Sequence, residues 1–133
     1  MAARQMSVTL IDTDIMIDAG RQVREAVACL DEIERRSTLA ISVITRMELF
    51  VGCRNKTELR NIERFLQRFR VFNLSEPACD IAVDLLRRFR LSHGLAIPDA
   101  LIVATAMMID CALITKNQQD YRFISGLQLL SYP

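Results

Sequence analysis

Short apolar runs alternate with longer amphipathic stretches along this chain. A run of four or five mostly apolar residues bounded by polar ones is typical of a buried strand. Such runs predict strands at residues 8–11, 39–43, 71–74, 112–115 and 127–130. The run at 71–74 is expected to form only a short strand.

Between these strands, apolar residues recur every three or four positions, which predicts helices with one buried face. The predicted helices cover residues 22–36, 45–51, 56–70 and 76–91. The last of them should stop at His93 and Gly94, because glycine readily adopts the left-handed conformation that closes helices. A further helix over residues 98–109 is apolar on nearly every side and should be buried.

Strands that alternate with helices favour an α/β domain with a mainly parallel sheet and helices on both faces, a three-layer α/β/α arrangement. No repeat, linker or low-complexity segment divides the chain, so we expect one domain over residues 7–133. In sheets of this kind, ligands bind beyond the carboxyl ends of the strands. Functional side chains should therefore directly follow strands or begin the next helix.

Composition narrows the possibilities further. The chain has 133 residues, 51% of them hydrophobic and 25% charged, which is typical of one folded domain. Its formal net charge of +1 gives no global attraction to nucleic acid. The single histidine and four well-separated cysteines offer poor support for a zinc site. The first residues lack the apolar core of a secretory leader, and the apolar stretch 100–109 is too short to span a bilayer, so we expect a cytoplasmic protein without a membrane segment.

Carboxylates occupy the positions at which the topology predicts a crevice. Asp12 and Asp14 follow the first strand, and Glu48 lies in the first turn of the helix after the second strand. Asp99 lies at the start of the buried helix, behind Pro98. Asn117 and Asp120 follow the strand predicted to end at Thr115.

Carboxylates that are brought together in a low-dielectric pocket repel one another and stay ionised only with a cation among them. Oxygen ligands without histidine or cysteine select a hard ion, Mg²⁺ or Mn²⁺. Such an ion suits phosphodiester hydrolysis, because it lowers the pKa of an attacking water and stabilises a leaving oxygen.

Each of these residues also has a purely structural interpretation. Asp12 or Asp14 would cap a short helix over residues 15–19. Thr45 and Glu48 have the spacing of a capping box, and Asp99 complements a helix dipole. Asn117 and Asp120 resemble ordinary turn residues. The functional interpretation rests on the agreement of all these positions with a single crevice.

Four segments resemble the PIN-domain family, in particular its VapC-like toxins. They are LIDTDIMID at 10–18, ISVITRMELFVG at 41–52, HGLAIPDALIVATA at 93–106 and LITKNQQDY at 113–121. The segments occur in the family's order and at similar separations, and the resemblance extends from about Ser7 to the end of the chain.

The resemblance implies that Asp12, Glu48 and Asp99 are the metal-binding carboxylates and that Asn117 belongs to the catalytic set. Many relatives have aspartate at the position of Asn117, so we expect one firmly held ion, with a second arriving with substrate. Further residues are expected to contact substrate at the edge of the site: Thr13, Asp14, Arg46, Thr115, Lys116 and Asp120.

The same resemblance implies a function. It implies a magnesium-dependent endoribonuclease, with Mn²⁺ able to substitute, that is the toxin of a type II toxin–antitoxin system. A small antitoxin protein would restrain it, RNA would be its substrate, and it would form homodimers.

A basic stripe on the helix predicted at 56–70 consists of Arg60, Arg64 and Arg68. Residues 54–70 contain six basic and two acidic side chains, a local balance of +4. This stripe would contact RNA phosphates or, as we favour, form a solvated helix face.

Two alternatives from other classes remain open at this point. A receiver-like phosphoacceptor domain would use Asp12, Asp14, Thr115 and Lys116, but a clear acceptor aspartate after a central strand is missing. A catalytically silent PIN-fold binding module would keep the fold for partner contacts alone. Three mutually repelling acids argue against it.

Overall fold

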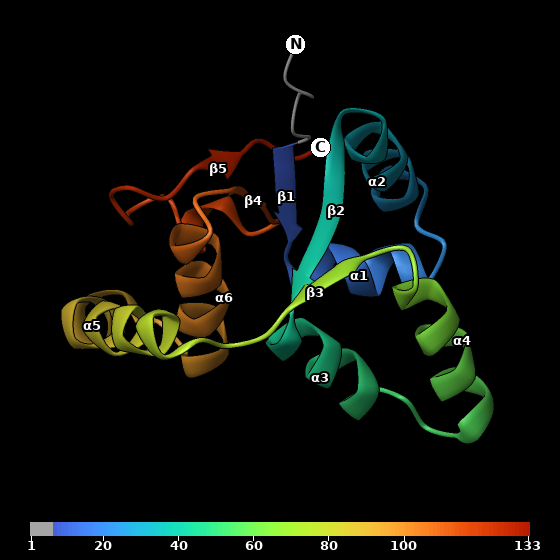
Figure 1. The fold of residues 1–133 in the computed structure, drawn as a ribbon, viewed down its shortest axis with the longest axis horizontal. Helices are drawn as coiled ribbons and strands as arrows, with labels where there is room; N and C mark the ends of the chain where they lie inside the picture. The colour runs from blue at the N-terminus through green and yellow to red at the C-terminus, as the bar shows by residue number, and fades with distance from the viewer. Residues whose placement is uncertain (1–6) are drawn as a thin grey trace, which may run out of the picture.

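Five parallel strands form the centre of the computed structural model, which describes residues 7–133 (Figure 1). The strands are β1 (Ser7–Ile11), β2 (Ser37–Ser42), β3 (Arg70–Phe72), β4 (Ala112–Ile114) and β5 (Leu129–Leu130), in the order β3-β2-β1-β4-β5. Leu10 of β1 pairs with Ala40 of β2 and with Leu113 of β4, so β1 is central. The predicted parallel α/β sheet is confirmed.

Six α-helices and one short 3-10 helix connect and cover the strands in the described part of the chain. They are α1 (Thr13–Gly20), α2 (Arg24–Arg36), α3 (Val43–Val51), α4 (Lys56–Leu66), α5 (Glu76–His93), α6 (Ile97–Met108) and η1 (Gln118–Asp120). Helices α5 and α6 lie on one side of the sheet, and α1, α2 and α4 lie on the other (Figure 1). This is the expected three-layer arrangement.

The alternation of side chains along the strands explains these layers. Leu10 and Leu113 belong to the core beneath α5 and α6, whereas Ile11 and Ile114 belong to the core beneath α1, α2 and α4. Successive strand side chains point to opposite faces, so a continuous apolar run fills both cores at once. This is why consecutive residues are apolar in β1 (Leu10 and Ile11) and in β4 (Leu113 and Ile114).

Several predicted boundaries of helices and strands differ from the structure, and two helices show the physical reason. The helix predicted at 45–51 begins at Val43, because Ser42 caps it by accepting the Ile44 backbone N–H on its Oγ at 3.1 Å. The helix predicted at 56–70 ends at Leu66, and Arg70 already pairs with β2. The apolar stripe continues to Phe69 because that ring packs in the core from the turn.

The C-terminus of α5 confirms the predicted glycine stop. Gly94 has φ +70°, and its backbone N–H donates to Arg90 O at 2.9 Å. This left-handed conformation has little cost for glycine and a real cost for other residues. The turn that follows carries the chain back toward the start of α6.

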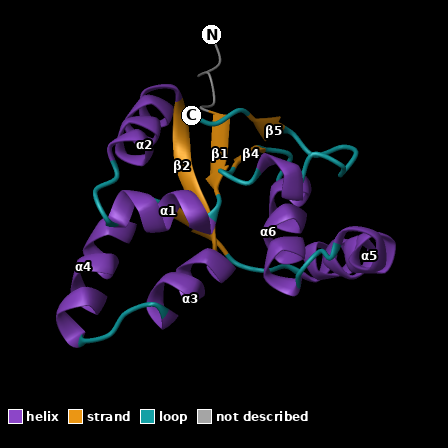
Figure 2. Ribbon diagram, turned by 180° about the vertical axis from the view of Figure 1, so that it is seen from behind, coloured by secondary structure: helices purple, strands orange, loops and turns teal. Residues whose placement is uncertain are grey.

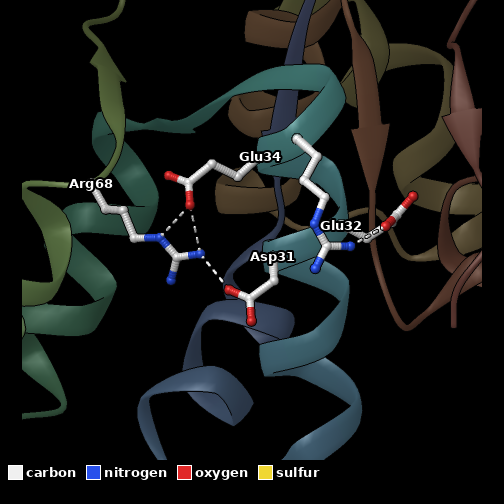
Figure 3. A network of polar contacts seen from close by, with 5 residues as sticks. Asp31, Glu32, Glu34 and Arg68 are labelled. Atoms are coloured by element: carbon white, nitrogen blue, oxygen red, sulfur yellow. Dashed lines mark hydrogen bonds and ion pairs between the residues drawn. The ribbon is translucent and has the colours of Figure 1, made fainter.

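The basic stripe is not uniform. Arg68 donates from Nη2 to Asp31 at 2.8 Å and to Glu34 at 3.0 Å, both on α2 (Figure 3). Arg68 therefore cross-links the turn after α4 to α2, which is a structural role. Arg60 and Arg64 remain exposed on α4.

Two expectations concern membranes and targeting. Within residues 7–133, no helix has both the length and the apolar character needed to cross a bilayer. The expectation about a secretory leader concerns residues 1–6, which lie outside the described part of the chain.

Candidate active site

Asp12 lies at the carboxyl end of β1, and both of its carboxylate oxygens accept hydrogen bonds. Oδ1 accepts the Thr13 backbone N–H at 2.8 Å, and Oδ2 accepts the Thr115 hydroxyl at 2.8 Å. Asp12 is 5% exposed, and its own N–H extends the sheet by donating to Ile114 O at 3.0 Å. The structural interpretation of Asp12 as the N-cap of α1 is confirmed, and the same contacts hold its carboxylate rigidly at the sheet edge.

Thr115 joins the end of β4 to the start of α1. Its hydroxyl lies 2.8 Å from Asp12 Oδ2 and 3.1 Å from Asp14 Oδ2, and it is fully buried. The Lys116 backbone N–H also donates to Asp14 Oδ2 at 3.1 Å. The structure thus brings together the two acids after β1 and the residues after β4, as the crevice rule predicts.

The negative charges near Asp12 act on its pKa. The pKa of Asp12 is raised to about 6, chiefly by burial and then by the charge of Asp14, with a smaller contribution from Asp99. Hydrogen bonds from Thr115 and Thr13 oppose this rise. A carboxylate held in this way is destabilised when ionised, and a cation beside it would relieve that cost.

Asp99, in the first turn of α6, belongs to the same group of charges. Burial raises its pKa, and the charges of Asp120 and Asp14 act in the same direction. The Tyr121 hydroxyl opposes the rise by hydrogen bonding to the carboxylate. Asp12 and Asp99, which are 87 positions apart in the numbering, therefore lie close enough to repel each other.

Glu48 is connected to this group in a different way. It lies on α3, and its Oε1 accepts the Thr13 hydroxyl at 2.7 Å. Its charge is not among the causes of the raised pKa of Asp12 or Asp99. The capping-box interpretation was wrong, because the helix is capped by Ser42, three residues before Thr45.

The donor chemistry of this region suits a hard divalent cation. Every side chain described above offers oxygen, in carboxylates or hydroxyls, which are the ligands that Mg²⁺ and Mn²⁺ prefer. In the arrangement seen for residues 7–133, however, no three His, Cys, Asp or Glu side chains converge on one point. The structure brings Asp12, Asp14 and Asp99 into electrostatic contact and reaches Glu48 through Thr13.

The remaining predicted residues lie around this group. Asn117 donates its backbone N–H to Thr115 Oγ1 at 3.2 Å, and Asp120 is exposed in η1. Lys116 Nζ forms an ion pair with Asp18 at 2.6 Å. The Arg46 guanidinium lies over the Phe50 ring, 5.4 Å from its centroid. Arg46 is therefore held by an aromatic ring of its own helix.

Sequence reasoning assigned no role to Tyr121 and gave Thr45 only a role as a helix cap. Tyr121 is 3% exposed, and burial together with the charges of Asp12 and Asp99 raises the pKa of its hydroxyl. A buried tyrosine needs a hydrogen-bond partner for its hydroxyl. The hint in the sequence that Tyr121 belongs to the site was its position one residue after Asp120. Thr45 is fully buried against Thr13.

Comparisons with known proteins find similarity over most of the chain. A family model described as PIN domain matches residues 9–124. Ribonuclease VapC10 of Mycobacterium tuberculosis is 38% identical over 120 residues, which is 90% of each chain. Ribonuclease VapC19 of the same organism is 36% identical over 121 residues, 90% of this chain and 96% of the relative.

Solved structures are similar over nearly the whole chain. A toxin–antitoxin complex from Klebsiella pneumoniae contains a chain with 34% identity and a TM-score of 0.76, covering 92% of this chain and 96% of the other. In the VapBC2 complex from Rickettsia felis, crystallised with a promoter DNA fragment, a chain with 24% identity has the same fold, with a TM-score of 0.81 and coverage of 95% and 99%.

Proposed function

The chain belongs to the PIN-domain family, and from this premise we propose that it is a metal-dependent endoribonuclease that acts as the toxin of a toxin–antitoxin pair. The observation that carries the proposal is the buried Asp12, whose pKa is raised to about 6 at the carboxyl ends of parallel strands. Burial of an acid beside Asp14 and Asp99 makes the fold less stable unless a cation is bound. The relatives named as ribonucleases support RNA as the substrate.

We propose that Asp12, Asp99 and Glu48 hold one Mg²⁺ ion, for which Mn²⁺ can substitute. The bound ion would lower the pKa of a water and stabilise the leaving oxygen of the phosphodiester. Thr115 keeps Asp12 oriented through the bond to Oδ2, while the Thr13 N–H fixes Oδ1. The side chain of Asn117 is a weaker ligand than a carboxylate, which favours a second ion that arrives only with substrate.

The edge of the crevice provides groups for the substrate. Thr13 and Thr115 bring hydroxyls, and Asp14 and Asp120 bring carboxylates, close to the proposed metal-binding acids. Lys116 Nζ must leave Asp18 before it can meet a phosphate, and Arg46 must leave the Phe50 ring. Both are exposed, so such a change would cost little.

The test is RNA cleavage by charge-neutralising variants. Asp12→Asn and Asp99→Asn each remove one charge with little change of volume, so cleavage should fall at least about 100-fold while the fold survives. A chelator should abolish cleavage by the unmodified protein, and added Mg²⁺ or Mn²⁺ should restore it. Circular dichroism confirms folding, and Asp84→Asn is the matched control, since Asp84 is a carboxylate on α5 paired with Arg87.

Cleavage that persists in both variants would overturn the site assignment. A protein that binds Mg²⁺ or Mn²⁺ in calorimetry but cleaves no RNA would favour the silent binding module. The receiver-like alternative gains nothing from the family match, and it would require phosphorylation by a small phosphodonor.

We further propose a small antitoxin protein as partner, a homodimer as the free state, and the cytoplasm as the location. The toxin–antitoxin complex from Klebsiella pneumoniae, at 34% identity, supports the first of these. Exposed apolar side chains support an interface of some kind, since Val51 is 86% and Leu91 is 100% exposed.

A further inference from the structure

Two buried threonines, Thr13 and Thr45, connect α1 to Glu48, which is the most exposed of the three predicted metal-binding acids. Thr13 Oγ1 lies 2.9 Å from Thr45 Oγ1 and 2.7 Å from Glu48 Oε1. Thr45 and Glu48 are three residues apart on α3, so both side chains lie on the helix face that packs against α1. The three oxygens therefore form a chain from the core to the surface.

The direction of this chain follows from the chemistry of its members. An ionised carboxylate can only accept hydrogen bonds, and a hydroxyl has one proton to donate. Thr13 must therefore donate to Glu48, and Thr45 must then donate to Thr13. Two hydroxyls in series polarise each other, which strengthens the bond to the carboxylate.

Thr13 also contacts the first acid of the site. Its backbone N–H donates to Asp12 Oδ1 at 2.8 Å, while its hydroxyl donates to Glu48. One residue thus sets the position of both acids, and its own side chain is oriented by Thr45, which is fully buried. Both carboxylate oxygens of Asp12 are hydrogen-bonded, so Thr13 is held between Asp12 and Glu48 by contacts of its backbone and its side chain.

Glu48 needs a contact that fixes the position of its side chain. It is an exposed side chain with several rotatable bonds, and ordering it costs rotamer entropy. The contact with Thr13 occupies Oε1 only, which leaves Oε2 for another ligand.

We propose that Thr13 and Thr45 are positioning residues that hold Glu48 Oε1 through a hydroxyl relay and present Oε2 to the catalytic cation. The inference rests on the proposed function for the identity of that cation. The relay itself rests on three side chains of this chain and their contacts.

The test combines Mn²⁺ calorimetry with NMR of the Glu48 side chain in the full-length protein. In Thr13→Val the hydroxyl is lost with little change of shape, so Mn²⁺ should bind about 10-fold more weakly. The two γ-methylene protons of Glu48 should give separate signals in the unmodified protein and should merge in this variant. Thr13→Ser keeps a hydroxyl and should restore both properties.

A double-mutant cycle separates positioning from a general loss of stability. Glu48→Gln should weaken Mn²⁺ binding by itself, and the double variant with Thr13→Val should be no weaker, because the relay acts only through Glu48. Thr45→Val should reproduce Thr13→Val more mildly. Thr9→Val is the matched control, because Thr9 in the middle of β1 is also buried and bonded to another hydroxyl, that of Ser37 at the start of β2.

Several results would overturn the relay. They are additive losses in the cycle, unchanged Glu48 signals in Thr13→Val, or an equal loss of Mn²⁺ binding in Thr9→Val. An unmodified protein that binds no Mn²⁺ and cleaves no RNA would overturn the proposed function instead. The NMR comparison would then still decide whether the relay orders Glu48.

Discussion

Asp12 shows how one residue can satisfy a structural and a functional interpretation together. It caps α1 with Oδ1 and receives the Thr115 hydroxyl on Oδ2, and it remains 5% exposed. The capping contacts lower its pKa, yet burial and Asp14 raise it more, to about 6. The balance leaves an acid that is costly to ionise, which is typical of functional sites.

The raised pKa of Asp12 predicts a stability gain in Asp12→Asn without metal. The folded state holds the Asp12 proton more tightly than the unfolded state, whose pKa is near 3.8, so this group lowers the free energy of unfolding as pH rises from 3.8 through 6. At pH 7 and above the full cost is present, and its removal should add up to about 3 kcal/mol.

Urea denaturation with a chelator present checks this expectation. The gain of Asp12→Asn should be largest at about pH 7.5 and clearly smaller near pH 5, where the folded protein already carries the proton. Asp84→Asn should show no gain, because Arg87 lowers the pKa of Asp84. An equal gain at both pH values would contradict the buried-charge explanation.

At the scale of elements, the start of α3 decides how the second acid is used. A helix that began at Thr45 would place Glu48 in its first turn, whereas the observed start at Val43 places Thr45 in the first turn and Glu48 in the second. Thr45 then faces α1 and meets Thr13. The position of the cap at Ser42 is therefore what makes the contact with Glu48 possible.

The connection between α2 and the turn after α4 depends on Arg68. Its guanidinium bonds to Asp31 and Glu34 together, so Arg68→Met should lower the free energy of unfolding by about 1 kcal/mol in low salt. In about 1 M salt the loss should shrink, because screening weakens ion pairs near the surface. Thermal or urea unfolding of Arg68→Met and of the unmodified protein, at both salt concentrations, measures this loss.

Arg64→Met is the matched control for this experiment, because Arg64 lies exposed one turn earlier in the same stripe. It should change stability by less than about 0.5 kcal/mol. Equal losses in the two variants, or a loss that salt does not reduce, would show that Arg68 acts through its aliphatic stem instead.

The whole molecule is organised around a sheet with helices on each face (Figure 2), and a hydrophobic core lies under each layer of helices. The carboxyl ends of β1 and β2 lead directly into α1 and α3. Asp12 and Glu48 therefore follow two adjacent strands. Because the strands are parallel, Asp12 and Asp14 after β1 lie beside Thr115 after β4 at this edge of the sheet, and Glu48 is connected to them through Thr13.

Association is a property of the molecule as a whole, and the mass of the particle in solution tests the proposed homodimer directly. Light scattering should give about twice the 15.2 kDa mass of one chain, since apolar side chains such as Val51 and Leu91 are more stable when covered. Unfolding temperature should also rise with protein concentration.

Co-expression with a small protein encoded by a neighbouring gene should yield a complex that cleaves no RNA.

A mass of one chain at all concentrations would contradict the dimer. Full cleavage activity in a purified complex with the neighbouring protein would contradict the antitoxin role. These two results are independent of each other and of the site assignment.

The linear pattern of residues was sufficient to predict the elements and the parallel sheet, because strand runs that fill two cores and helices with one apolar face differ visibly in period. It was also sufficient to place the acids Asp12 and Asp14 at the carboxyl end of a strand, where ligands bind to parallel sheets. Asp99 lies in a helix that follows another helix, so its place near Asp12 was decided by packing. The family resemblance added their roles, which periodicity alone does not contain.

Only the tertiary structure decided the contacts between distant segments. The meeting of Thr13 with Thr45, of Thr115 with Asp12 and of Arg68 with α2 depends on how helices pack, and packing is set by the summed volumes of many side chains. A hydrogen bond between residues 103 positions apart leaves no mark on local spacing. For the same reason the sequence pointed to the acids of this site, while the hydroxyls that hold them became visible only in three dimensions.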